Sequence, residues 1–195
     1  GRRNAGGSGN DRIRLPQGAT VDRDLVYEVI QGRKLRLDLY RPQSANPTAL
    51  VIWIHGGGWK SGSKAGGGPA VFQLLQRGYA VASVEYRLSG EAVFPAAIED
   101  CKAAVSFLRL YADKYNLDPK RFGVWGSSAG GHLVSLLGTT IDVDQFDTHP
   151  VTRKASSSVQ AVCNWFGPSD FLRMNDFPGR INHDAADSPE SRFIG

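Results

Sequence analysis

Ser128 lies at the centre of a Gly-x-Ser-x-Gly pattern that follows one short apolar run and precedes another. Where a strand turns sharply into a helix, such a serine is exposed at the turn and can attack a carbonyl carbon. A serine hydroxyl is a weak nucleophile, so it also needs a nearby base and donors for the oxyanion that forms. Gly126 and Gly130 stand two residues to either side, where a tight turn leaves no room for a Cβ. The pattern therefore predicts nucleophilic catalysis by Ser128.

The segments around this serine predict the elements that position it. Continuous apolar runs alternate along the chain with segments whose apolar residues recur every three or four positions. We expect strands at 48–54, 79–85, 121–125 and 158–166, and helices after residues 70, 95 and 128. Strands that alternate with helices predict the α/β class, with a mostly parallel sheet and helices on both faces.

The N-terminal part of the chain has a different pattern. Residues 1–20 are rich in Gly, Asn and Arg, which is typical of a flexible leader, and residues 21–195 would form the folded part. Two segments, 24–30 and 34–40, alternate apolar and polar residues around a turn that contains Gly32. They predict an antiparallel hairpin with one face toward the core.

The composition indicates one globular domain and excludes several classes of function. The 195 residues are 41% hydrophobic and 22% charged, which suits a single buried core. The net charge of +4 is small and the basic residues are scattered, so we expect no nucleic-acid partner. No apolar run approaches the roughly 20 residues of a membrane span. Cys101 and Cys163 are too few for a disulfide scaffold, and we expect both to be free, buried thiols.

The order of the elements resembles the α/β-hydrolase fold, and within it the esterases and lipases whose oxyanion loop begins with His-Gly-Gly. Over about residues 22–195 the chain is similar to bacterial carbohydrate esterases related to feruloyl and acetyl-xylan esterases. The segments that carry this resemblance are His55-Gly56-Gly57-Gly58-Trp59, Glu85-Tyr86-Arg87-Leu88-Ser89, Phe94-Pro95-Ala96-Ala97, Ser127 to Leu133, Phe166-Gly167-Pro168-Ser169-Asp170 and Ser188-Pro189-Glu190-Ser191-Arg192.

The resemblance implies an oxyanion hole built from backbone N–H groups. Gly57 and Gly58 would supply donors from the loop, and Ala129 would supply a third just after the nucleophile. Glycines suit this role because the substrate carbonyl must approach the backbone closely. A turn that merely closes a strand would explain one glycine, but it would not explain three in a row.

The resemblance also places the triad acid and the histidine after later strands than this chain carries. His55 precedes the nucleophile, so we expect it to brace the oxyanion loop, and His132 lies on the helix after Ser128, where packing is its simplest role. His149 and His183 follow no apolar strand. We therefore expect both partners of Ser128 beyond Gly195. Residues 21–195 would be about the N-terminal two-thirds of one catalytic domain, because such domains usually need roughly 250 residues.

Three other residues are candidates for minor roles in the site. Asp170 follows the last predicted strand and is an alternative triad acid, although it would also serve as a cap for a helix over 171–175. Trp59 adjoins the glycine loop and Trp165 ends the last strand. Either indole is a candidate wall of the acyl pocket, and core packing is the alternative for both.

These residues predict a serine carboxylic-ester hydrolase that works through an acyl-enzyme on small or carbohydrate-linked acyl esters, of acetyl or feruloyl type. The acidic segment 142–147 lacks the glycine and the final glutamate of a calcium loop, and we expect neither a metal nor an organic cofactor. Two alternatives stay open: an aryl-formamidase or other amidase of the same fold, and an inactive binding protein that keeps the pocket. The resemblance favours a secreted or periplasmic location.

Overall fold

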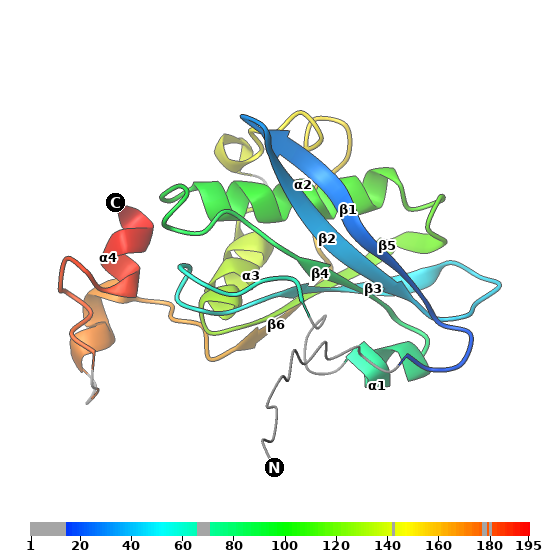
Figure 1. Cartoon of the computed structure of the whole chain (residues 1–195), viewed down its shortest axis with the longest axis horizontal. Coiled ribbons are helices and arrows are strands. Elements are labelled where there is room, and N and C mark those ends of the chain that lie inside the picture. Colours follow the sequence, from blue (N-terminus) through cyan, green and yellow to red (C-terminus); the bar gives the residue numbers. More distant parts are fainter. Residues whose placement is uncertain (1–14, 66–70, 142, 177–178, 180) are drawn as a thin grey trace, which may run out of the picture.

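The computed structural model describes residues 15–65, 71–141, 143–176, 179 and 181–195, which form one twisted sheet flanked by helices (Figure 1). The sheet has the order β1-β2-β4-β3-β5-β6. Its strands are β1 (Thr20–Ile30), β2 (Arg33–Arg41), β3 (Thr48–Ile54), β4 (Ala80–Val84), β5 (Leu117–Ser127) and β6 (Ala161–Trp165). The helices are α1 (Val71–Gln76), α2 (Ala96–Leu110), α3 (Ala129–Thr139) and α4 (Pro189–Ile194), with short 3-10 turns η1 (Asp144–Phe146) and η2 (Phe171–Asp176).

The pairing of the strands confirms the predicted α/β-hydrolase class. β1 and β2 form the expected antiparallel hairpin, and β2 also runs antiparallel to β4. The remaining pairs, β3 with β4, β3 with β5, and β5 with β6, are parallel. Parallel neighbours in this order require crossovers, and the helices supply them. The carboxyl ends of β3 and β5 therefore meet at one edge of the sheet.

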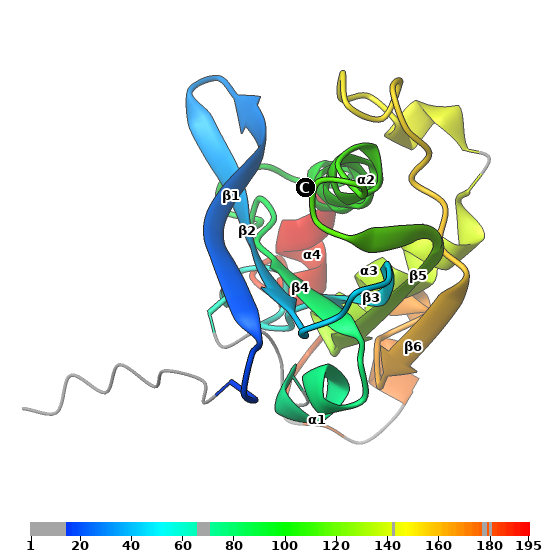
Figure 2. The same cartoon turned by 90° about the vertical axis from the view of Figure 1, so that its right-hand side faces the viewer.

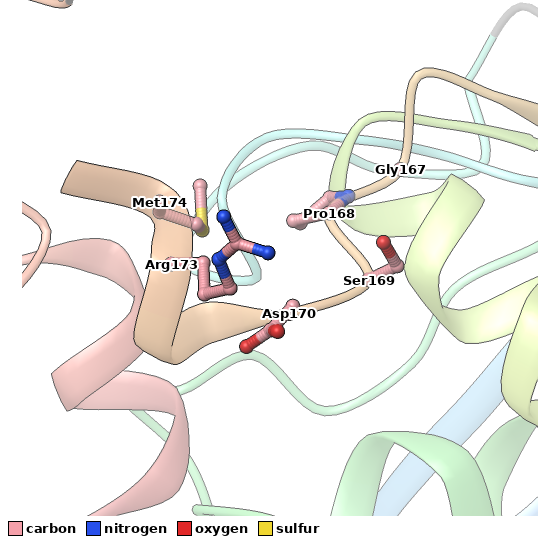
Figure 3. A pocket seen from close by; sticks show the side chains of 6 residues that line it. All are labelled: Gly167, Pro168, Ser169, Asp170, Arg173 and Met174. Carbon is pink, nitrogen blue, oxygen red and sulfur yellow. The ribbon is translucent and has the colours of Figure 1, made fainter. Parts of the chain in front are cut away.

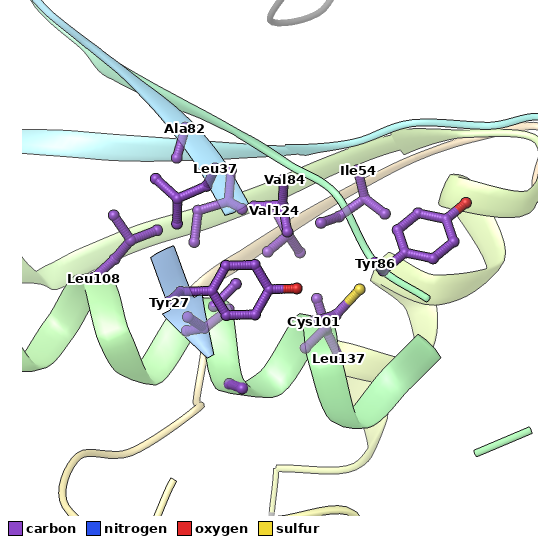
Figure 4. Packing of buried hydrophobic residues seen from close by; sticks show 14 of the residues in the cluster. Tyr27, Leu37, Ile54, Ala82, Val84, Tyr86, Cys101, Leu108, Val124 and Leu137 are labelled. Carbon is purple, nitrogen blue, oxygen red and sulfur yellow. The ribbon is translucent and has the colours of Figure 1, made fainter. Parts of the chain in front are cut away.

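Helices lie on both faces of the sheet, as the alternating pattern predicts. α2 and α3 cover one face, and the small helix α1 lies against the other (Figures 1 and 2). Alternate residues of β3 divide between the two faces: Leu50, Ile52 and Ile54 join the larger cluster under α2 and α3. Figure 4 shows this cluster, in which Leu37 of β2 and Leu108 of α2 are fully buried. No residue of β3 is exposed on either face of the sheet, which explains why the run 48–54 is continuously apolar.

The structure departs from the sequence predictions in several places. Cys101 is buried as predicted, but Cys163 is exposed, because β6 is an edge strand whose residues are all accessible. β5 begins at Leu117, four positions before its predicted start at Arg121. The helix predicted over 171–175 is present as the 3-10 helix η2 and ends one residue later, at Asp176. Most of the predicted leader, residues 1–14, lies outside the described residues, and Leu15 already packs against the small cluster beside α1.

Candidate active site

Ser128 occupies the turn between the end of β5 and the start of α3. Its backbone has φ 53° and ψ −123°, a conformation that few residues other than glycine adopt. The Ser128 N–H donates to the carbonyl oxygen of Trp165 at 2.9 Å, so β6 holds the turn from one side. Its side chain is exposed, as a nucleophile that meets a substrate must be. A strained, exposed serine between a strand and a helix is the geometry of a nucleophile elbow.

The two glycines of the pattern are required by close backbone contacts. A Cβ on Gly126 would overlap the carbonyl group of Gly130, one turn further on. A Cβ on Gly130 would overlap the carbonyl oxygen of Ile54 and lie 2.6 Å from that of His55. The elbow is therefore packed directly against the end of β3, and neither position has room for a side chain.

The glycine loop after β3 lies against the nucleophile. Ile54 pairs with Gly126 across the parallel strands, so the two loops start side by side. A Cβ on Gly56 would lie 2.7 Å from the Ser127 carbonyl oxygen and 3.3 Å from the Cβ of Ser128. The structure thus brings the predicted oxyanion loop and the predicted nucleophile together.

The backbone of this loop turns through consecutive left-handed residues. Gly57, Gly58 and Trp59 have φ values of 114°, 57° and 55°. The carbonyl oxygen of Gly57 accepts hydrogen bonds from the N–H of Lys60 and Ser61, which fixes the loop as a tight turn. Ala129 is the first residue of α3, and the N–H groups of a first helical turn have no partner within the helix. Backbone N–H groups of this kind are the donors that an oxyanion needs.

His55 braces the glycine loop, as the sequence predicts. Its Nδ1 lies 2.8 Å from the carbonyl oxygen of Gly56, and its ring stacks on Tyr86 with centroids 4.4 Å apart. The Tyr86 hydroxyl donates to the His55 carbonyl oxygen at 3.0 Å. Burial lowers the pKa of His55, because a charged ring is poorly solvated there. This side chain is therefore a neutral structural support at neutral pH.

The other three histidines also contact groups other than the Ser128 hydroxyl. His132 packs edge-on against Trp59, with centroids 5.4 Å apart, and burial lowers its pKa to about 4. His149 Nε2 lies 3.2 Å from Asp100 Oδ1, and His183 Nδ1 lies 3.0 Å from Glu190 Oε2. Each of these rings thus has a structural role of its own.

Trp59 lies in an aromatic cluster beneath the loop and is only 1% exposed. Its ring stacks on Phe193 of α4 at 4.7 Å and 19°, and it meets Phe171 of η2 at 5.3 Å. Sequence reasoning missed both phenylalanines, although Phe193 follows the Ser-Pro-Glu segment that carries part of the resemblance. Through these contacts the buried Trp59 side chain anchors the glycine loop to α4 and η2.

Trp165 lies against Trp125, with ring centroids 4.5 Å apart, on the sheet face that α1 covers. Its ring is 42% exposed, and its backbone carbonyl is the group that reaches Ser128. Asp170 accepts the N–H of Leu172 at 3.1 Å through Oδ1, which is a cap on η2, and its carboxylate is exposed. Neither contact links these two side chains to the Ser128 hydroxyl.

A cavity of about 430 Å³ opens at the segment after β6, where Gly167 packs against Gly131 in the first turn of α3 (Figure 3). The residues that line it are Gly167, Pro168, Ser169, Asp170, Arg173 and Met174. Within the described parts of the chain, no cluster of three His, Cys, Asp or Glu side chains could hold a metal ion. A search of the described helices also found none long and apolar enough to cross a membrane.

Comparisons with known proteins agree with this geometry. Esterase LipC of Mycobacterium tuberculosis is 33% identical over 138 residues, which cover 69% of this chain and 34% of that protein. The bifunctional GH43-CE protein of Bacteroides eggerthii superposes with a TM-score of 0.78 at 37% identity, over 89% of this chain and 24% of that one. A truncated carbohydrate esterase from gut microbiota also gives 0.78, at 32% identity, over 90% of this chain and 65% of that one.

The chain therefore spans about a third of the length of the curated esterases that it matches. It spans 65% of the truncated carbohydrate esterase. Its match to the family BD-FAE runs over residues 37–195, which include the glycine loop, the elbow and α4. From this match over most of its length, the chain belongs to the BD-FAE family.

Proposed function

We propose that this protein is a serine carboxylic-ester hydrolase in which Ser128 is the nucleophile. The observation that carries the proposal is the contact between two separate loops: the strained serine at the end of β5 and the left-handed glycine loop at the end of β3. A packed turn alone would not require three consecutive left-handed residues beside an exposed serine. The esterase names of the relatives agree with this chemistry.

The reaction follows from the positions of these groups. The Ser128 oxygen attacks the ester carbonyl carbon and transfers its proton to a base, while the carbonyl electrons move onto the oxygen. The N–H groups of Gly57, Gly58 and Ala129 stabilise that oxyanion, and one such donor contributes about 3 kcal/mol. The intermediate collapses, the bond to the alcohol breaks, and the alcohol leaves with the proton. Water then attacks the acyl-serine in the same way and releases the acid.

The proposal places the histidine base and the triad acid outside residues 1–195. His55, His132, His149 and His183 each have the structural contacts described above. Asp170 accepts the N–H of Leu172 through Oδ1 and so caps η2, and we assign it that structural role. The rest of the catalytic domain would then be an obligatory partner of this chain.

The substrate class that we propose is an acyl ester linked to a carbohydrate, of acetyl or feruloyl type. The two structures with a TM-score of 0.78 support it, since one is named a carbohydrate esterase and the other a GH43-CE protein. The cavity after β6 is mostly apolar, has a few polar groups and has a volume of about 430 Å³, which is within the range of small-ligand pockets.

Substitution of the nucleophile tests the proposal. Ser128→Ala in the full-length protein should lower kcat for p-nitrophenyl acetate by at least about a thousandfold, because no acyl-enzyme can form. Ser156→Ala, at an exposed serine before β6, is the matched control and should retain full activity. Equal turnover by the wild type and Ser128→Ala would refute the assignment.

A further inference from the structure

The segment that lines the cavity packs against two parts of the proposed site. A Cβ on Gly167 would overlap the backbone of Gly131 and His132 in the first turn of α3. Phe171, in the same segment, packs at 5.3 Å from Trp59 and 5.1 Å from His132. The segment that lines the cavity is therefore fixed against both the nucleophile helix and the oxyanion loop.

Two charged side chains of the cavity have hydrogen-bonding capacity left over. Asp170 uses Oδ1 to cap η2, and among the described residues its Oδ2 has no partner. Arg173 donates through Nε to Asp176 at 2.9 Å, and its two Nη groups donate to no residue that the structure describes. The Arg173 side chain is 68% exposed, so a ligand can reach these donors. Figure 3 shows the Arg173 guanidinium between Met174 and Pro168, and the Asp170 carboxylate on the other side of Arg173.

The charges around the cavity decide which ligand suits it. One guanidinium stands beside two carboxylates, Asp170 and Asp176, so the surroundings carry no net positive charge for an anionic ligand. A ring with several neutral hydroxyl groups can donate to a carboxylate through one of them and accept from a guanidinium through another. Pro168 and Met174 offer apolar surface on which the C–H face of a ring can pack. These features together favour a ring that carries hydroxyl groups.

We propose that this cavity binds the alcohol portion of the ester, and that it selects a neutral polyhydroxylated ring such as a sugar through Asp170 and Arg173. The proposal rests on the esterase function proposed above and adds the residues that determine specificity. A volume of about 430 Å³ lies within the range of small-ligand pockets and accommodates one such ring.

Two esters with the same acyl group and leaving groups of similar shape test the subsite. A methyl glucoside that carries one acetyl group has a polyhydroxylated leaving group, and cyclohexyl acetate has an apolar ring. The full-length wild type should show the higher kcat/KM for the sugar ester. Asp170→Asn and Arg173→Met should each lower the ratio of the two kcat/KM values about tenfold, chiefly through KM for the sugar ester.

The variants separate recognition from structural damage. Asparagine retains the oxygen that caps η2, so Asp170→Asn removes charge with little change to the fold. Arg77→Met, at an exposed arginine beyond α1, is the matched control and should leave the ratio unchanged. A structural defect would lower turnover of both esters and leave their ratio intact.

Each result has a defined meaning. A ratio that stays within twofold of wild type in both variants would overturn the subsite while leaving the esterase proposal intact. A wild-type protein that hydrolyses neither ester would overturn both proposals. If Arg173→Met does not fold, the ratio measured for Asp170→Asn decides.

Discussion

The strained backbone of Ser128 has a measurable cost. A non-glycine residue at φ 53° and ψ −123° stores roughly 1–3 kcal/mol that the surrounding contacts must offset. Glycine adopts such a conformation without strain, although it also loses more conformational entropy on folding. Ser128, the proposed nucleophile, is thus held in place at the expense of stability.

Ser128→Gly should therefore fold more stably than Ser128→Ala while both lack activity. We expect a difference of about 1 kcal/mol in the free energy of unfolding, measured by urea denaturation, because alanine removes the hydroxyl but keeps the strain. Equal stability of the two variants would contradict a strained elbow.

His132 gives the protein a specific response to acid. Its folded pKa of about 4 is below the usual value of 6.5, because the ring is buried among aromatic side chains. The unfolded state therefore binds more protons between these values, and the stability from neutral His132 is present above 6.5 and is lost as the pH falls toward 4.

His132→Phe should flatten the pH dependence of the free energy of unfolding between about 6.5 and about 4. Phenylalanine keeps an aromatic ring beside Trp59 and Phe171 but cannot take up a proton. Urea denaturation at several pH values would measure the slope for both proteins. The same slope in the variant as in the wild type would exclude His132 as its source.

At the scale of elements, α4 packs against the glycine loop and supports it. Phe193 stacks on Trp59, its carbonyl oxygen accepts the N–H of Phe94 at 2.7 Å, and a Cβ on Gly58 would lie 3.2 Å from Pro189. A hydrogen bond between His183 Nδ1 and Glu190 Oε2 holds the segment before the same helix. α4 thus contacts both the glycine loop, at Gly58 and Trp59, and the segment before α2, at Phe94.

Phe193→Ala should lower both stability and kcat. Loss of a buried phenylalanine typically costs about 3–5 kcal/mol, and the loop would lose the ring that supports Trp59. Ile194→Ala, at a neighbouring side chain that is 54% exposed, is the matched control and should change little. Thermal unfolding and p-nitrophenyl acetate turnover would measure both effects. A wild-type kcat in a folded Phe193→Ala protein would contradict a role in holding the loop.

The sequence predicts local elements better than contacts between them. β3 has its predicted bounds because its apolar run ends sharply at Pro47 and His55. The start of β5 was missed because Asp118 and Pro119 resemble a turn, whereas pairing of Leu117 with Thr48 extends the strand across a register shift. The support of Trp59 by Phe193 depends on residues more than a hundred positions apart, and no local pattern encodes it.

At the scale of the whole molecule, β6 is an unprotected edge of the sheet. Every residue of β6 is exposed, and Phe166, just beyond it, is 78% exposed. An apolar groove of about 280 Å³ runs beside it on the α1 face, lined in part by Val162 and Cys163. Exposed strand edges with apolar side chains pair readily with other chains.

Residues 1–195 expressed alone should therefore self-associate. Val162→Lys, which places a charge on this strand, should increase the monomer fraction in size-exclusion chromatography with light scattering. Val29→Lys, at a side chain of β1 that is 50% exposed, is the matched control and should have less effect. A monomeric wild-type chain at high concentration would contradict the expectation.

The pairing of Ile54 with Gly126 has a consequence for divergence within the family. Main-chain hydrogen bonds between β3 and β5 set the separation of Ser128 from the glycine loop, and strand side chains do not enter it. Core residues can therefore be exchanged for others of similar volume without moving the reacting groups. A library that randomises Leu50, Ile52 and Val124 among aliphatic residues should yield many active members, whereas one at Gly126 or Gly130 should yield almost none.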